Sequence, residues 1–337
     1  MKSLYKISIL IVATGLIFAS CTKTASKSGG NNTPPPELNG TVQNDISYGS
    51  NVDYYGNNVD LKLDLYTPDK TLAQSNGKYP LYVWVHGGAF LIGEKSEGAN
   101  EMILMTNQGF ISAAINYRLG WDRDMNGDMC SGDSASLKEA IYRAIQDVNA
   151  SLRFLVANAD KYKIDTSKIF IGGSSAGGVA ILNTHYITQD YANQMVPGAI
   201  AKFGYINSAD NNLKNTFTIK GIVSEWGGIN DEMRLNKGNT VPTIFFHGEL
   251  DDVIPYDIGT VFQCPDQLPA YGAKPLYDRV TSLGFEAQAY IDPNGGHGVY
   301  DDGFRANYAS AFLKSIIKSN EQSGFHIVDG PDFVRGD

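Results

Sequence analysis

The chain has 337 residues, of which 42% are hydrophobic and 19% charged. It is therefore long and apolar enough to bury one large core and need not be divided into several domains. The formal net charge is −9 at pH 7. Because an acidic surface repels the phosphate backbone, nucleic acid is not an expected partner.

The N-terminal residues have the composition of an export signal. Residues 1–20 combine a basic start, an apolar stretch of about a dozen residues and small residues before Cys21, a pattern too short for a membrane-spanning helix. Phe18-Ala19-Ser20-Cys21 resembles the lipobox of bacterial lipoproteins. This implies that Cys21 is lipidated and anchors an exported protein to a membrane. The alternative is an ordinary cleaved signal in which Cys21 has no role.

Residues 21–40 are expected to form a flexible tether between the anchor and the folded part. From residue 22 to residue 36 the chain is rich in Lys, Ser, Gly, Asn and Pro and has no apolar periodicity. Such a segment cannot bury enough apolar surface to fold. One folded domain is then expected over residues 41–337.

In that domain short apolar strands alternate with longer helical patterns. Strict alternation within residues 46–66 predicts an antiparallel hairpin. Apolar residues recur at helical spacing over residues 134–157 and 306–317. Further strands are expected at residues 79–85, 109–116, 168–172, 220–226, 242–247 and 285–291. This order predicts an α/β fold with a mostly parallel central sheet and helices on both faces, in which site residues gather at the carboxyl ends of the strands.

A glycine-rich turn follows the strand expected at residues 79–85. In His86-Gly87-Gly88-Ala89 the side chains after the histidine are absent or small. The N–H groups of Gly88 and Ala89 can therefore converge on one oxygen, as an oxyanion hole requires. His86 is expected to bond to the loop backbone rather than to act as a base.

An acidic segment copies the spacing of a calcium loop, with oxygen-bearing side chains at alternate positions and a glycine turn. Its candidate ligands are Asp122, Asp124, Asn126, Asp128 and Asp133. The twelfth position is Asp instead of Glu, and a solvated or disulfide-pinned loop is the preferred interpretation, so no metal is expected.

Two cysteines remain once Cys21 is set aside. Cys130 and Cys264 are expected to form a disulfide, because paired cysteines in an oxidising compartment are usually bridged. The disulfide would hold loops near the site and take no part in the chemistry. The alternative is two separate buried thiols.

Ser175 is the candidate nucleophile. It follows an apolar strand and opens a helical run, with Gly173 and Gly177 two positions to either side, where larger side chains would clash in a sharp strand-to-helix turn. The turn pushes the hydroxyl into the cleft, and the Ala176 N–H at the helix N-terminus completes the oxyanion donors. Ser174 is the competing serine, but only Ser175 is centred between the two glycines.

An acid and a base follow later in the chain. Asp251 comes after the strand expected at residues 242–247, where a carboxylate can accept the imidazole N–H; Asp252 and Glu249 are the alternatives. His297 lies in a glycine loop after the last expected strand and is the candidate base by elimination and chain order. Trp226, at a strand end beside two glycines, is a candidate for lining the acyl pocket.

These motifs resemble the α/β-hydrolase fold, specifically carboxylesterases with an HGG oxyanion motif. Matching segments run from Tyr82 to Gly298. They are similar to bacterial lipoprotein carboxylesterases and to the BD-FAE-like and type-B-like branches. The resemblance implies a triad of Ser175, Asp251 and His297, oxyanion donors at Gly88, Ala89 and Ala176, and no cofactor.

The expected activity is hydrolysis of short-chain or plant-polysaccharide-linked acetyl or feruloyl esters outside the cytoplasm, through an acyl-enzyme. The expected partners are the ester substrate and, through the lipid anchor, a membrane. Two alternatives stay open. A serine exopeptidase of the same fold lacks an evident acidic anchor for a peptide amine, and an inactive esterase-like binding protein would not need an intact set of Ser175, Asp251 and His297.

Overall fold

The computed structural model describes residues 34–124, 127–320 and 322–330. The expected signal peptide, Cys21 and Asn126 of the acidic segment lie outside the described residues. Within the described ranges, no helix has the length and apolar character needed to cross a membrane.

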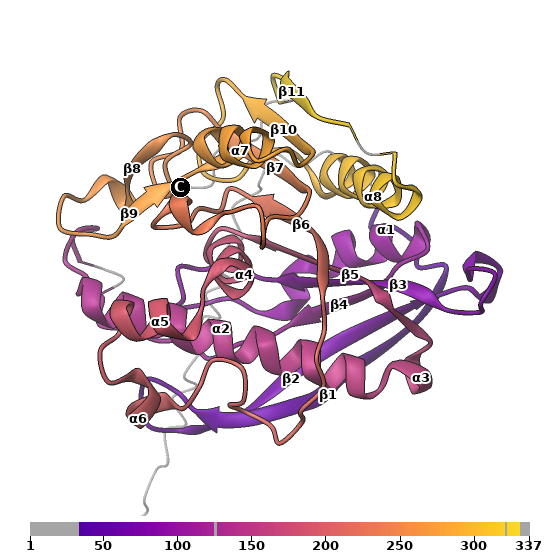
Figure 1. Cartoon of the computed structure of the whole chain (residues 1–337), viewed down its shortest axis with the longest axis horizontal. Coiled ribbons are helices and arrows are strands. Elements are labelled where there is room, and N and C mark those ends of the chain that lie inside the picture. Colours follow the sequence, from indigo (N-terminus) through magenta and orange to yellow (C-terminus); the bar gives the residue numbers. More distant parts are fainter. Residues whose placement is uncertain (1–33, 125–126, 321, 331–337) are drawn as a thin grey trace, which may run out of the picture.

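A nine-stranded sheet forms the centre of the fold (Figure 1). Its strand order is β1-β2-β4-β3-β5-β6-β7-β10-β11. β2 pairs antiparallel with β1 and β4, and every pair from β4 to β11 is parallel. The strands are β1 (Gly40–Val52), β2 (Asn58–Pro68), β3 (Tyr79–Val85), β4 (Ile111–Ile115), β5 (Ile164–Ser174), β6 (Ile219–Glu225), β7 (Thr243–Gly248), β10 (Ala287–Asp292) and β11 (Gly324–Ile327). The predicted hairpin and mostly parallel sheet are confirmed.

Helices cover both faces of this sheet, as predicted. α1 packs with α8 on one face, and α2 packs with α4 on the other (Figure 1). The helices are α1 (Ala99–Asn107), α2 (Ser134–Ala157), α3 (Ala159–Tyr162), α4 (Ala176–Tyr186), α5 (Gln189–Met195), α6 (Ala199–Phe203), α7 (Ala273–Ser282) and α8 (Asp302–Lys318). A separate antiparallel pair, β8 (Ile258–Thr260) and β9 (Pro269–Tyr271), lies between β7 and α7 in the chain.

The central strands are buried on both faces because each belongs to two cores. In β3, Leu81 and Val83 pack with α2 and α4, whereas Tyr82 and Trp84 pack with α1 and α8. Successive side chains of a strand point to opposite faces, so an uninterrupted apolar run fits a strand covered on both sides. This burial makes the sheet a rigid base for the loops at its edge.

Two of the predicted boundaries differ from the structure for reasons that specific contacts explain. The helix predicted from residue 306 begins at Asp302, because the Asp301 side chain accepts a hydrogen bond from the Phe304 N–H and caps the first turn. The tether predicted to end at residue 40 ends earlier. The Asn107 side chain bonds to the Glu37 carbonyl and the Asn39 N–H, so these residues are already part of the folded domain.

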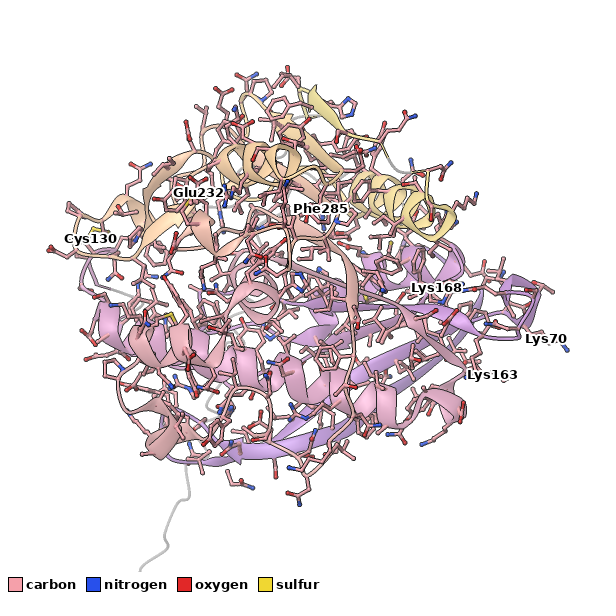
Figure 2. The ribbon with its side chains drawn as sticks, viewed as in Figure 1. Lys70, Cys130, Lys163, Lys168, Glu232 and Phe285 are labelled. Carbon is pink, nitrogen blue, oxygen red and sulfur yellow. A yellow bond between two sulfur atoms is a disulfide. The ribbon has the colours of Figure 1, made fainter. Side chains whose placement is uncertain are left out.

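The two ends of the parallel strands carry different residues. Figure 2 shows Lys70, Lys163 and Lys168 at the end where β3 and β5 begin, and Cys130 at the opposite end. Cys130 belongs to the loop between β4 and α2, at the carboxyl ends of the strands. The candidate site residues are at that end.

Candidate active site

Ser175 occupies a strained turn between β5 and α4. Its φ of 52° and ψ of −119° lie in a region that L-residues rarely adopt. The Ser175 N–H donates to the Glu225 carbonyl over 2.9 Å, which ties the turn to the end of β6. A side chain at Gly177 would place its Cβ 2.0 Å from the Val85 carbonyl oxygen, so α4 can leave the sheet at this angle only with glycine there.

The His297 ring lies between Ser175 and Asp251. Its Nε2 is 2.7 Å from the Ser175 Oγ, and its Nδ1 is 2.9 Å from the Asp251 Oδ2. A carboxylate only accepts hydrogen bonds, so the contact assigns the proton to Nδ1 and leaves Nε2 free to accept the serine proton. The three candidate triad residues, far apart in the sequence, are thus joined by hydrogen bonds.

Asp251 is held as a carboxylate by several donors. Its Oδ1 accepts from the N–H groups of Val253 and Ile254 over 2.9 and 3.0 Å, and its Oδ2 is 3.2 Å from the His247 Nε2. Burial alone would raise the pKa of Asp251, but the hydrogen bonds and charges of His247 and His297 outweigh it and hold this pKa well below its ordinary value. Asp251 is therefore ionised at neutral pH.

The alternative acids and the competing serine lie outside this arrangement. Glu249 and Asp252 are exposed, whereas the Asp251 side chain is fully buried. The hydroxyl that contacts the imidazole belongs to Ser175, not to Ser174. The structure therefore brings together the residues that chain order favoured.

The expected oxyanion donors flank Ser175 on two sides. Ala89 and Ala176 line the same cavity as Ser175, whereas Gly88 is not one of its lining residues. The turn is tight, because Leu91 and Ile92 both donate to the Gly88 carbonyl and because Gly88 and Ala89 have positive φ angles of 98° and 53°. In the described part of the chain, no acceptor satisfies the N–H groups of Gly88, Ala89 or Ala176, which leaves them available to a ligand oxygen.

His86 holds this turn through contacts of its ring. Its ring stacks on Tyr117 with 4.4 Å between centroids, and its Nδ1 lies 2.8 Å from the Gly87 carbonyl, to which it donates. Burial lowers the pKa of His86 to about 4, so the ring is neutral at pH 7. These contacts match the backbone-holding role expected for it.

Beside Ser175 lies a mostly apolar cavity of about 50 Å³. Two aromatic rings, Phe90 and Phe262, contribute to its wall. The remaining lining residues are Ala89, Leu137, Ile141, Ser175, Ala176, Val179, Asn183, Gly228, Ile229, Asn230, Val253, Ile254, Val261, Leu268, Pro269 and Ala270. Its position next to the nucleophile suits the acyl part of a substrate.

Trp226 does not line this cavity, which corrects the expectation for it. Its φ of 40° turns the chain at the end of β6, and its ring packs edge to face against His297, with 6.4 Å between centroids. The Arg305 guanidinium lies 5.1 Å from the Trp226 ring centroid. Trp226 therefore contacts the candidate base and not the acyl cavity.

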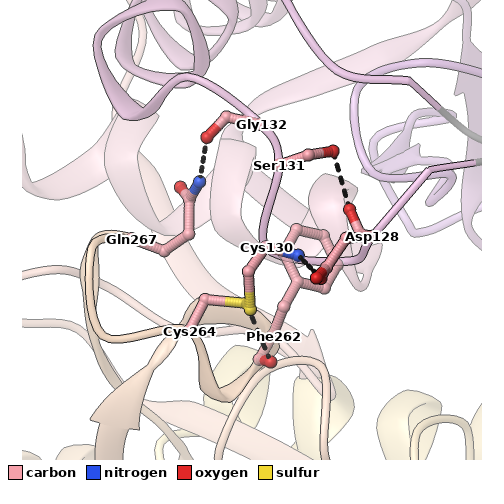
Figure 3. Close-up of a disulfide and its surroundings, with 7 residues drawn as sticks. All are labelled: Asp128, Cys130, Ser131, Gly132, Phe262, Cys264 and Gln267. Atoms are coloured by element: carbon pink, nitrogen blue, oxygen red, sulfur yellow. Dashed lines mark hydrogen bonds between the residues drawn. A yellow bond between two sulfur atoms is a disulfide. The ribbon is translucent and has the colours of Figure 1, made fainter.

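The predicted disulfide between Cys130 and Cys264 is present (Figure 3). It joins the loop before α2 to the segment 261–270, which contributes five residues to the cavity wall. Gln267 also donates to the Gly132 carbonyl, and the Arg123 guanidinium lies 4.1 Å from the Phe262 ring centroid. Residues 261–270 of the cavity wall are thus fastened to the loop before α2.

Two carboxylates of the acidic segment have structural partners. The Asp133 side chain caps α2 by accepting from the Ser136 N–H, and the Asp128 side chain accepts from the Cys130 N–H. Among the residues with described positions, no three His, Cys, Asp or Glu side chains are grouped closely enough to hold a metal ion. The disulfide and these two hydrogen bonds hold the described part of the segment.

Two features of the site were not predicted. His247 makes a second contact with Asp251, and Asn183 and Asn230 place polar groups in the cavity. A signal existed for Asn183, because residues 175, 179 and 183 share one face of α4. The roles of His247 and Asn230 depend on loop conformations that the sequence pattern does not express.

Comparison with known proteins places the chain in a family. The family model BD-FAE matches residues 63–238. The chain belongs to the BD-FAE family. The matched segment contains the turn at His86 and the nucleophile turn at Ser175, and it ends before Asp251.

Curated relatives and solved structures extend this comparison. Carboxylesterase 1C of Rattus norvegicus is 29% identical over 174 residues, which are 51% of this chain but only 29% of that protein. The truncated carbohydrate esterase from gut microbiota has a TM-score of 0.55 at 18% identity, covering 85% of this chain and 100% of that one. Esterase 2 of Thermogutta terrifontis, phosphorylated by paraoxon, has a TM-score of 0.52 at 17% identity, covering 87% and 100%. At these identities the structural likeness establishes the α/β-hydrolase fold.

Proposed function

We propose that this protein is a serine carboxylic ester hydrolase in which Ser175, His297 and Asp251 form the catalytic triad. The observation that carries the proposal is the continuous hydrogen-bonded path from the Ser175 Oγ through His297 to the buried Asp251 carboxylate. The paraoxon-phosphorylated relative and the carboxylesterase relative support the same class of reaction. No cofactor takes part in the proposed reaction.

Each residue has one role in the proposed mechanism. The Ser175 Oγ attacks the ester carbonyl while the His297 Nε2 takes its proton, and Asp251 stabilises the resulting imidazolium. The N–H groups of Ala89 and Ala176, with Gly88, receive the negative oxygen of the tetrahedral intermediate. His297 then protonates the leaving alcohol, and water repeats the cycle on the acyl-enzyme.

The proposed substrates are esters of short acyl groups, including those linked to polysaccharides. The cavity beside Ser175 is narrow and mostly apolar, which suits a small acyl group. The carbohydrate esterase from gut microbiota, which has the same fold, supports a sugar hydroxyl as the leaving group. Export by residues 1–20, lipidation of Cys21 and the resulting membrane anchor remain part of the proposal, and mass spectrometry of the mature N-terminus tests them.

Hydrolysis of a nitrophenyl ester series, from acetate to decanoate, tests the proposed function. We expect turnover of the short esters by the protein and its loss, by roughly 10⁴-fold or more, in Ser175→Ala. Ser174→Ala is the matched control and retains turnover. Equal hydrolysis by the protein and Ser175→Ala, or none by either, contradicts the proposal and favours peptide substrates or a binding role.

A further inference from the structure

The cavity beside Ser175 has a polar region. Apart from Ser175, the only polar side chains in its lining belong to Asn183 and Asn230. Asn183 lies eight residues after Ser175 on the same face of α4, roughly 12 Å along the helix at 1.5 Å per residue. An acyl group bound to Ser175 that follows this face meets Val179 first and then Asn183.

The buried Arg234 orients both amides. Its guanidinium donates to the Asn183 Oδ1 over 3.0 Å and to the Asn230 Oδ1. A guanidinium has no acceptor, so both carbonyl oxygens must face Arg234 and the amide nitrogens must face elsewhere. The amide oxygens are therefore occupied by Arg234, and the nitrogens are the amide groups left for a ligand.

Each amide nitrogen keeps one hydrogen that it can donate to a ligand. The Asn183 Nδ2 donates to the Val179 carbonyl over 2.8 Å, and the Asn230 Nδ2 lies 3.4 Å from the Tyr191 hydroxyl. An amide nitrogen carries two hydrogens, and no further acceptor for either nitrogen lies among the described residues. The polar region therefore offers donors and suits a ligand oxygen that accepts.

The Arg234 guanidinium, which contacts both amides, forms no ion pair within the described residues. Arg234 is 8% exposed, and no carboxylate among the residues described by the structure forms an ion pair with it. The Tyr191 ring, 4.6 Å away, compensates part of the charge, and burial lowers the pKa of Arg234 to about 10. Within the described residues, Arg143 and Arg153 are also buried without an ion pair, but the carbonyls to which they donate lie outside the cavity lining.

We propose that the cavity accepts an acyl group that carries a carboxylate at its far end, bound by the amide nitrogens of Asn183 and Asn230 with Arg234 behind them. The substrate class is then the half-ester of a dicarboxylic acid. Attack forms the Ser175 Oγ–carbonyl bond, breaks the ester bond and sends the proton to the leaving alcohol, and water releases the free dicarboxylate. This inference rests on the proposed esterase function and adds its acyl specificity.

The test compares nitrophenyl adipate half-ester with nitrophenyl hexanoate, which has an acyl chain of the same length. The readout is the ratio of kcat/KM for the two esters, after subtraction of the rate with Ser175→Ala. In Asn230→Asp the new carboxylate pairs with Arg234 and repels the substrate carboxylate, so the ratio falls about tenfold to a hundredfold. Asn215→Asp adds the same charge at an exposed position and keeps the ratio of the unmodified protein.

The Tm and a second variant distinguish a loss of folding from a loss of carboxylate binding. Asn230→Asp is nearly isosteric and completes an ion pair, so its Tm is expected to stay equal or rise; Arg234→Met is the second variant, and it lowers the ratio by removing the charge. An unchanged ratio in both variants overturns the dicarboxylate inference while leaving the esterase function in place. Absence of Ser175-dependent hydrolysis of either ester overturns the esterase function and, with it, this inference.

Discussion

His247 and Asp251, four residues apart at the end of β7, are in direct contact, with 3.2 Å between the His247 Nε2 and the Asp251 Oδ2. The same nitrogen lies 3.0 Å from the Ile254 carbonyl, so one N–H is shared between the carboxylate and the loop that follows it. Asp251 therefore receives histidine contacts on both sides, from His247 and from His297. His247 is a positioning residue, because it acts on the base only through Asp251.

Replacing His247 tests this role. His247→Phe keeps a ring of similar size but removes the donor, so we expect kcat/KM for a short nitrophenyl ester to fall about tenfold to a hundredfold. The loss should lie in kcat rather than in KM, because the ester still binds while Asp251 orients His297 less firmly. His326→Phe, which changes an exposed histidine, is the control and should leave both quantities unchanged. An unchanged kcat in His247→Phe would show that His247 only fills space.

The disulfide is expected to stabilise the protein and to shape the acyl cavity. Cys130 and Cys264 are 134 residues apart, so the bond closes a long loop and restricts the unfolded chain. In Cys130→Ser with Cys264→Ser, we expect the free energy of unfolding, measured by urea denaturation, to fall by about 2–5 kcal/mol.

The same double variant loosens the wall formed by residues 261–270, so hydrolysis of longer acyl esters should rise relative to acetate. Reducing agent serves as the control, because it should act on the unmodified protein and not on the double variant. Equal chain-length profiles in the two proteins would mean that other contacts, such as Arg123 with Phe262, are sufficient to hold the wall.

Asp210 predicts a dependence of stability on pH. It shares the Arg118 guanidinium with Asp147, and both side chains are fully buried. Burial, then the charge of Asp147, raise the pKa of Asp210 to about 8 against an ordinary value of 3.8. The folded protein therefore binds a proton that the unfolded chain releases near pH 4, so stability is lost as pH rises from about 4 to about 8.

Asp210→Asn removes this titration while keeping the shape of the side chain. We expect the fall in Tm between pH 5 and pH 8 to be smaller in the variant by at least ~5 °C. Asp160→Asn, at an exposed acid, is the matched control. Parallel Tm curves for the variant and the unmodified protein would show that Asp210 is already ionised in the folded state.

Much of the fold follows from local patterns, and the site follows from them in part. The alternation of strands and helices, the turn at Ser175 and the turn at His86 are each contained in a few consecutive residues, so the sequence expresses them directly. The prediction that Trp226 lines the acyl pocket was wrong, because its ring packs against His297. Trp226 has a positive φ angle, which no pattern in the sequence predicts. The Arg234 contacts join residues of α4 and of the loop after β6, so only the folded chain reveals them.

We propose that Ser175 is the nucleophile of this site. Treatment with paraoxon, followed by mass spectrometry of proteolytic peptides, tests it most directly, because an activated serine forms a stable phosphoryl adduct. We predict one adduct, on Ser175, together with loss of esterase activity, and the same adduct in Ser174→Ala. An adduct on another residue, or full activity after treatment with none on Ser175, would contradict the claim.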